Sequence, residues 1–396
     1  MIMSTSIPSS DRGVLGQLGR ELAEAAADPV NDERRRVHEA VDQMQTGRPS
    51  ITFFQEPWNE LEQTGELDMR CVDPFCQGIE RDLRRKLYKW RHHPGDLVVA
   101  AESIQPYCIE DSGFGISEQV DIVKTDAANN VVSRHFHIQI QDEGDIEKIK
   151  MPVISHNARL TEELYQKRNE IFDGILSVRK QGITSFWFVP WDELICWTGI
   201  QEILMDLVLR PDYVHKLVAR LVDCWLSRVD QLEAQGLLEQ PAREMTVSGA
   251  AQIFSEVSPE MHGEFALQHE ARFFKRFKRV HYGCCEPLHN KVDICAQYLP
   301  NLYQISMSPW VDFRKGAQNV RNRFIFGWRP HPAMLAGEHW DPGAVRRYLE
   351  ENLAIAHEYG CTVAMYMKDI STVNREPKRL EEWNKIAKEC VSQYAV

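Results

Sequence analysis

Apolar and polar positions follow two different rhythms in the first part of the chain. Over the first fifty residues, and again over 76–90, apolar positions recur at helical spacing among many charged residues, which predicts helices. Residues 97–102 (LVVAAE) form a short β-branched run that predicts a buried strand. Between 111 and 145 polar and apolar residues alternate around Asn129-Asn130, which predicts a β-hairpin.

From residue 160 onward, predicted helices and short apolar strands follow one another, a pattern typical of βαβ units with parallel strands. The chain has no glycine-rich turn of the GxGxxG or GxxxxGK[ST] kind, which disfavours a doubly wound nucleotide-binding sheet. With the run at 97–102 included, the strands number about seven, close to the eight of a barrel. Helices are predicted at 160–180, 201–209, 211–235, 258–278, 288–298, 342–359 and 377–392, and strands at 183–189, 245–247, 279–283, 302–308, 323–328 and 362–367.

The predicted fold is therefore an α/β (β/α)₈ TIM barrel with an N-terminal helical extension and a β-hairpin insertion. We expect residues 1–95 to form the helical extension and a lid segment, and residues 96–396 to form the barrel. Phe53, Phe54 and Trp58 are the aromatic residues of the predicted lid.

Composition narrows the class of protein. Of the 396 residues, 43% are hydrophobic and 26% charged, which is typical of a globular chain. Lys and Arg number 46 against 58 Asp and Glu, and a net charge of −12 argues against a nucleic-acid partner, which needs a basic face. No apolar run approaches the roughly 18 residues of a membrane span, and Met1–Arg12 lacks the apolar core of a signal peptide. We therefore expect a cytoplasmic protein with no membrane partner.

The strongest chemical signal follows the predicted strand 279–283. Ten cysteines without a secretion signal indicate thiols rather than disulfides. His281, Cys284 and Cys285 combine imidazole with thiols, the ligands that zinc prefers, at a strand end where barrel active sites form. Two alternatives stay open: the thiols pack in the core, or Cys284 is a nucleophile activated by His281. Which cysteine would face the pocket is also open, because a one-residue shift reverses side-chain direction.

Other predicted strand ends carry further polar and aromatic residues. Glu286, Asp312 and Asp369 are candidate catalytic groups that could orient ligands or move protons. Asp192 and Glu193 also follow a strand, but single acidic residues there are more typical of caps or solvated loops. The aromatic residues favour a pocket for a flat apolar ligand, and the predicted substrate-binding residues are Trp187, Trp191, Tyr282, Trp310, Trp328 and Arg329.

Three segments carry a resemblance to a known family. WTGIQEILMDLVLRPDYVHKLVARL (197–221), VSPEMHGEFALQHEARFFKRF (257–277) and RVHYGCCEPL (279–288) resemble the uroporphyrinogen decarboxylase superfamily, in its cobalamin-dependent methyltransferase branch. The last segment falls where that branch carries a zinc motif, H-x-C-G. Two departures are clear: the decarboxylases' arginine-rich signature has no counterpart in 51–61, and the first cysteine follows His281 by three residues rather than two.

The resemblance implies a corrinoid-dependent methyltransferase. It would move a methyl group, with the help of zinc, from a small donor to cobalamin on a partner corrinoid protein, and it would form a homodimer. The aromatic residues favour an aromatic methyl ether as donor. The alternative is a decarboxylase or lyase of a small carboxylated substrate on the same barrel, using Arg329 and Lys368. A third hypothesis is a corrinoid-binding or chaperone-like protein without chemistry of its own.

Overall fold

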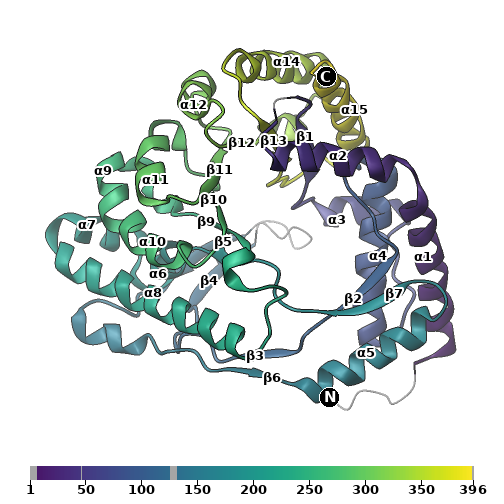
Figure 1. Ribbon diagram of the computed structural model, residues 1–396, viewed down its shortest axis with the longest axis horizontal. Coiled ribbons are helices and arrows are strands. Elements are labelled where there is room, and N and C mark those ends of the chain that lie inside the picture. Colours follow the sequence, from purple (N-terminus) through teal and green to yellow (C-terminus); the bar gives the residue numbers. More distant parts are fainter. Residues whose placement is uncertain (1–6, 46, 125–131, 395–396) are drawn as a thin grey trace. The chain divides into compact units, whose positions relative to one another are not determined.

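The computed structural model describes residues 7–45, 47–124 and 132–394, and these residues form two compact units. The first unit comprises the described residues of 1–106, 158–181 and 329–396, so that the purple N-terminal and yellow C-terminal helices both belong to it (Figure 1). The second unit comprises the described residues of 107–157 and 182–328.

The first unit has a helical core. Apolar residues of α1, α4 and α5 pack together, among them Leu15, Leu83 and Phe172. Its two pairs of strands are parallel: β1 (Ser50–Phe53) with β13 (Val363–Met367), and β2 (Glu102–Pro106) with β7 (Ser177–Gln181). The helices are α1 (Ser9–Ala27), α2 (Val30–Asp42), α3 (Trp58–Leu61), α4 (Pro74–His92), α5 (Ala158–Phe172), α13 (Ala333–Ala336), α14 (Pro342–Glu358) and α15 (Lys378–Ser392), with a 3₁₀ turn, η1 (Glu62–Thr64).

The second unit holds five parallel strands in the order β8-β9-β10-β11-β12. They are β8 (Trp187–Phe188), β9 (Thr246–Gly249), β10 (Arg279–Tyr282), β11 (Leu302–Met307) and β12 (Ile325–Trp328). The helices are α6 (Pro190–Thr198), α7 (Ile200–Leu209), α8 (Pro211–Ala234), α9 (Pro259–His262), α10 (Gln268–Phe274), α11 (Val292–Tyr298) and α12 (Phe313–Val320), with a π-helical turn, η5 (Gly263–Leu267), and 3₁₀ turns η2 (Glu143–Lys148), η3 (Ala242–Glu244), η4 (Gln252–Glu256) and η6 (Leu288–Asn290).

The predicted hairpin is confirmed. β4 (Val120–Val123) and β5 (Ser133–Phe136) pair antiparallel, and the turn predicted at Asn129-Asn130 lies outside the described residues. A second antiparallel pair in the same unit joins β3 (Ile109–Asp111) to β6 (Ile154–His156).

The α/β class with a parallel sheet is confirmed, but a closed eight-stranded barrel is not present in the described residues. The parallel sheet has seven strands, and β1 and β8 stand at its two ends. β2 and β7, which could have extended the sheet, instead pair with each other. The result is an open parallel sheet of the barrel-like type.

The prediction of a strand at 97–102 is wrong except for its last residue, Glu102, where β2 begins. Side chains of α2 satisfy the backbone of this run instead of a neighbouring strand. The Asn31 side chain accepts the N–H of Val99 at 2.8 Å, and Arg34 donates to the carbonyl of Leu97 at 2.7 Å. Because these backbone groups already have partners, this apolar run, in which only Val99 is buried, needs no neighbouring strand.

Two other predictions need correction. Phe53, expected in a lid, is a buried residue of strand β1, because Asp96 and the β13 backbone hold this short segment in the sheet. The helix predicted over 160–180 ends at Phe172, and Gly174 (φ 68°) turns the chain toward β7. Positive φ suits glycine, so the helix stops there.

Strand register in the second unit assigns its residues to two faces. Phe188, Gly249 and Tyr282 are in-register partners and lie on one face, where Phe188 stacks on Phe273 of α10 at 3.9 Å. Trp187 and His281 pair in register with Ser248 of β9, so these residues lie on the opposite face, away from α10.

We expect Gly249→Ala to destabilise the chain by about 1–3 kcal/mol through overpacking. A Cβ at this position would lie 2.5 Å from the Phe188 carbonyl oxygen and 2.5 Å from Cζ of Phe274. Gly13→Ala is the control, because a Cβ there meets nothing within 4 Å and the residue is helical. Urea denaturation measures both, and equal unfolding free energies for the two variants would contradict this packing.

Candidate functional site

The ends of three neighbouring strands meet in the second unit. Val189, Ala250 and Cys284 follow β8, β9 and β10, and their side chains form one buried apolar cluster. In open parallel sheets, ligands bind outside the carboxyl ends of the strands. The polar residues next to this cluster are therefore the candidates for a functional site.

Asp192 in the first turn of α6 is the first of these polar residues. Its Oδ2 accepts a hydrogen bond from the Gln252 side-chain amide at 2.6 Å. Its Oδ1 is buried and has no hydrogen-bond partner in the part of the chain that the structure describes. Burial raises the pKa of the Asp192 carboxyl, and negative charge on Cys284 adds to the rise, although the Gln252 bond opposes it. The group is thus suited to hold a proton.

The loop after β10 holds two thiols. Gly283 has φ 100°, a conformation that favours glycine, and a Cβ there would lie 2.3 Å from Leu288. The Cys284 N–H donates to the Glu286 carboxylate at 2.8 Å, which fixes the turn. The Sγ atoms of Cys284 and Cys285 lie 3.6 Å apart, and Cys284 is buried while Cys285 is exposed.

A buried hydrogen-bonded chain lies behind β10. The Tyr282 hydroxyl donates to Glu270 at 2.8 Å, and it lies 2.8 Å from Nε2 of His262. Burial raises the pKa of Glu270 to about 8, and the charges of Glu286 and Asp192 add to the rise, although the Tyr282 bond opposes it. Burial also lowers the pKa of His262 to about 3, helped by the positive charge of Lys291. His262 is therefore neutral, and it lies immediately before the π-helical turn η5.

Glu193, next to Asp192, faces a different neighbour. It accepts the indole N–H of Trp225 at 2.8 Å. Burial raises the pKa of Glu193 to about 7, against the effect of this hydrogen bond. Burial thus raises the pKa of three acidic side chains around the strand ends, Asp192, Glu193 and Glu270.

The predicted metal ligands do not form a complete ligand set in the described residues. His281 lies within β10, on the face away from α10, and its ring stacks on Tyr303 with centroids 5.9 Å apart. The two sulfurs, 3.6 Å apart, match two thiolates on one tetrahedral zinc, for which Zn–S bonds of about 2.3 Å give roughly 3.8 Å. However, no three His, Cys, Asp or Glu side chains of the described residues are grouped so that they could hold a metal ion. We therefore derive no chemical step through a metal.

The predicted aromatic residues fall into two groups. Trp191, Trp328 and Tyr282 are fully buried and belong to the core, where Trp191 packs edge-on against Phe254. Trp187 and Trp310 are 45% and 69% exposed, so their rings are accessible to a ligand. The role of these aromatic residues in substrate binding stays a prediction.

The remaining predicted site residues are Asp312 of the second unit and three residues of the first unit. Asp312 caps α12 by accepting the N–H of Lys315 at 3.0 Å. Arg329, Lys368 and Asp369 belong to the first unit. There Lys368 forms an ion pair with Asp369 at 3.1 Å, and Asp369 has φ 56°, a strained backbone of the kind found at functional sites.

Sequence reasoning missed a buried cluster in the first unit. Glu56 follows β1, and its carboxylate pairs with Lys89 at 2.6 Å and lies 3.7 Å from His93. The nearby His93 ring and the positive charge of Lys89 lower the pKa of Glu56 to about 2, despite its burial. Because the group is a stabilised carboxylate, we assign it an anchoring role at the end of β1.

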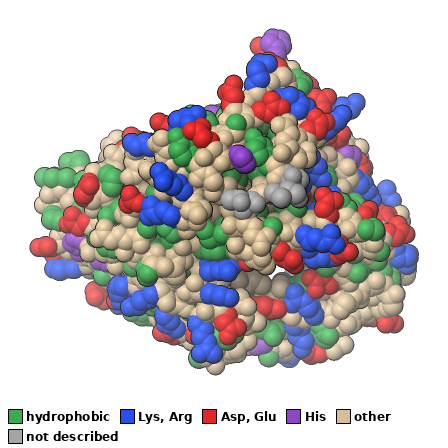
Figure 2. Space-filling view, turned by 45° about the horizontal axis from the view of Figure 1, so that its top comes forward, with side chains coloured by type: hydrophobic (Ala, Val, Ile, Leu, Met, Phe, Trp, Pro, Cys, Tyr) green, Lys and Arg blue, Asp and Glu red, His purple; other side chains and the backbone are tan. Residues whose placement is uncertain are grey.

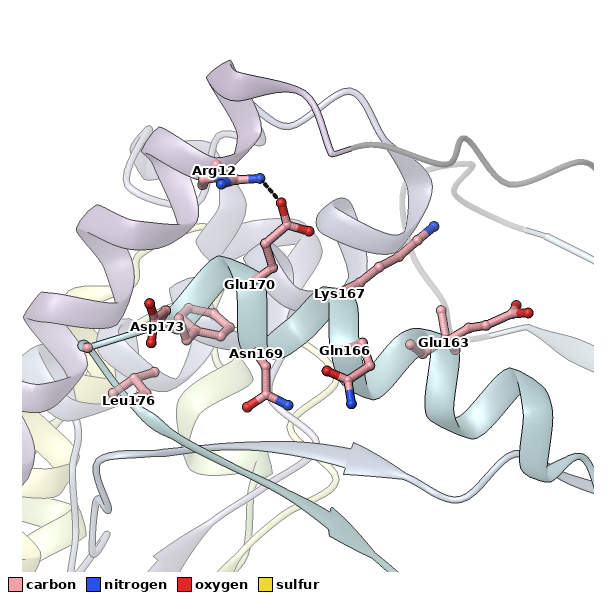
Figure 3. A pocket seen from close by; sticks show the side chains of 11 residues that line it. Arg12, Glu163, Gln166, Lys167, Asn169, Glu170, Asp173 and Leu176 are labelled. Atoms are coloured by element: carbon pink, nitrogen blue, oxygen red, sulfur yellow. Dashed lines mark hydrogen bonds and ion pairs between the residues drawn. The ribbon is translucent and has the colours of Figure 1, made fainter.

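A hollow of about 880 Å³ in the first unit is lined by α1 and α5 (Figure 3). Arg12 of α1 pairs with Glu170 of α5 across it, and Gln166 and Lys167 lie along the same helix. None of the described residues that line it is a cysteine or a histidine. It is a polar hollow at the surface.

The surface carries charges of both signs. On the face shown in Figure 2, acidic and basic side chains are interspersed rather than gathered by sign. Within the described residues, no helix has the length and apolar character that crossing a bilayer would require.

Comparison with solved structures shows a likeness in fold. No protein-family model matches the chain, and no curated protein matches it. The fold is similar to that of a methyltransferase from Methanosarcina mazei, with a TM-score of 0.51 and 11% sequence identity over 88% of this chain and 96% of the other. At this identity the likeness shows a shared fold.

Three functional candidates could not be singled out from the sequence. Gln252, His262 and Glu270 lie far from Asp192 and Cys284 along the chain, and they belong to helical turns without a recognisable motif. Asp192 was visible as a residue after a strand, but nothing in the sequence separated it from an ordinary helix cap. Its burial and its half-satisfied carboxyl are tertiary properties.

We expect the contribution of Glu270 to the free energy of unfolding to fall as pH rises from about 4.5 to about 8, by up to about 1.4 kcal/mol per pH unit. The folded pKa of Glu270 is raised, so its protonated form stabilises the fold, and this contribution is lost as the group ionises. Glu270→Gln should flatten this dependence in denaturant titrations, whereas Glu264→Gln, at an exposed neighbour, should keep it. An unchanged slope in Glu270→Gln would contradict the assignment.

Proposed function

We propose that this chain is a methyltransferase that moves a methyl group from a small methyl ether to a corrinoid carried by a partner protein. Two observations support the proposal: the fold is similar to a methyltransferase, and the strand ends of the second unit hold two adjacent thiols and an aspartate whose pKa is raised by burial and by the charge of Cys284. The observation that carries it is Asp192, a partly buried carboxyl whose Oδ1 is buried and has no hydrogen-bond partner among the described residues.

The chemistry of ether cleavage requires a proton. When the methyl group leaves, the ether oxygen departs as an anion, and a nearby acid makes that departure easier. Asp192 would donate this proton from Oδ1, while Gln252 holds Oδ2 in place at 2.6 Å. Bound cob(I)alamin would supply the nucleophile that accepts the methyl carbon.

The donor class follows from the exposed aromatics. Trp187 and Trp310 expose their rings, and Trp187 shares a sheet face with His281. Flat rings of this kind favour an aromatic substrate through stacking. We therefore propose an aryl methyl ether as the donor. A corrinoid protein and a second copy of this chain stay predicted partners.

We expect Asp192→Asn to slow methyl transfer from methoxybenzene to cob(I)alamin by roughly 10²–10⁴-fold, the usual range for a lost general acid. A nitro-substituted donor, whose phenolate leaves without a proton, should lose far less. Methylcobalamin formation is followed by absorbance, with Glu193→Gln as the neighbouring control because Glu193 faces Trp225. An equal loss for both donors would show that Asp192 is structural.

Zinc stays a prediction, and the two thiols are the groups that would hold it. We expect purified protein to contain about one zinc ion per chain if Cys284 and Cys285 are ligands. Elemental analysis should show that Cys284→Ser loses the metal and Cys196→Ser, a partly buried thiol on α6, retains it. An active preparation without metal would remove zinc from the proposal.

Decarboxylation is the second candidate, and one observation favours it. Arg329 and Lys368 are cationic side chains that are almost fully buried in the first unit. Such cations could neutralise a substrate carboxylate. The two candidates give different products, since a decarboxylase releases carbon dioxide and forms no methylcobalamin.

A further inference from the structure

The two adjacent cysteines at the end of β10 lie in an uncommon arrangement. Neighbouring residues in a continued strand point to opposite faces, which would keep their thiols apart. Here β10 ends at Tyr282, and the chain bends through Gly283, with φ 100°, before both cysteines. The bend brings the two sulfurs to 3.6 Å from each other.

The backbone before the thiols is held on both sides. The Gly283 N–H donates to the Gly249 carbonyl at 2.8 Å, and the Ser306 hydroxyl donates to the Gly283 carbonyl at 2.8 Å. The Glu286 carboxylate accepts the Cys284 N–H. Cys284 is therefore fixed and only 6% exposed, whereas Cys285 projects to solvent.

We propose that Cys284 and Cys285 form a reversible redox site, in which a small-molecule disulfide such as oxidised glutathione converts the two thiols into one disulfide bond. The inference does not depend on methyl transfer, because it concerns the chemistry of the thiols themselves. It assigns a covalent modification to a loop beside the candidate active site.

The reaction balances in two exchange steps. The exposed Cys285 thiolate attacks one sulfur of oxidised glutathione, and glutathione thiolate leaves, so that Cys285 carries a mixed disulfide. Cys284 then loses its proton, and its sulfur attacks Sγ of Cys285, releasing the second glutathione as thiolate. Two protein thiols are oxidised, and one glutathione disulfide is reduced to two thiols.

The geometry also favours reduction of the disulfide back to two thiols. The sulfurs must move from 3.6 Å to about 2.05 Å, which the exposed Cys285 side chain can do by rotation. Adjacent Cα atoms are about 3.8 Å apart, below the usual 4.4–6.8 Å of disulfides, and such a deviation makes the bond easier to reduce. The oxidised form offers no thiolate to a metal ion, so the disulfide and zinc binding by these two sulfurs exclude each other.

Mass spectrometry of one tryptic peptide tests the proposal. Cleavage after Arg279 and Lys291 gives residues 280–291, which contain Cys284 and Cys285 as the only cysteines. After incubation of the intact protein with oxidised glutathione and alkylation in denaturant, we expect this peptide without alkyl groups and lighter by two hydrogen atoms. Dithiothreitol should restore double alkylation.

Single variants separate this reaction from ordinary thiol modification. Cys284→Ser should accumulate a glutathione adduct on Cys285, because the second step has no attacking thiol. Cys196→Ser should behave as the wild type. The proposal is overturned if the wild-type peptide stays doubly alkylated while Cys284→Ser is glutathionylated, if the wild type accumulates the adduct, or if no variant reacts. Because the readout is mass, failure of methyl transfer would leave this result unaffected.

Discussion

The end of strand β10 depends on one buried hydroxyl. Tyr282 donates to Glu270 and lies within hydrogen-bond distance of His262, so the last residue of the strand is tied to the helical layer. Strand geometry then places His281 on the opposite face and starts the thiol loop at Gly283. The anchored Tyr282 thus fixes the end of the strand, and the hydrogen bonds of Gly283 and Cys284 fix the loop that follows it.

Buried carboxylates serve two purposes in this protein, and their hydrogen bonds distinguish them. Asp96 accepts the N–H of Ile51 and a bidentate pair from Arg48, and Glu60 accepts two backbone N–H groups near residue 373. These acids have partners on both oxygens, and they anchor loops. Asp192 has a partner on only one oxygen among the described residues, and its pKa is raised. Such a carboxyl can exchange a proton, whereas the satisfied ones cannot do so without breaking the loop.

Secondary structure could be predicted where a regular pattern of apolar residues extended over the whole element. The helices at 211–234 and 342–358 and the strand at 302–307 follow their apolar patterns to within a residue or two. Prediction failed where side chains replaced a strand partner, as Asn31 does at Val99. It failed again at β1, whose four residues were too short to separate from an aromatic loop. The local pattern of apolar residues does not indicate which distant group will accept a hydrogen bond from a backbone N–H.

The sequence by itself determined the α/β class, the parallel strands after residue 186, and the placement of two thiols directly after one of those strands. Tertiary structure decided the rest: that the sheet stays open, that Tyr282 faces the core while His281 faces away, and that Gln252 reaches Asp192. The physical reason is the separation along the chain of the residues that determine each property. Periodicity and strand direction are set by neighbouring residues, whereas burial, pKa and side-chain pairing depend on groups brought together from distant parts of the chain.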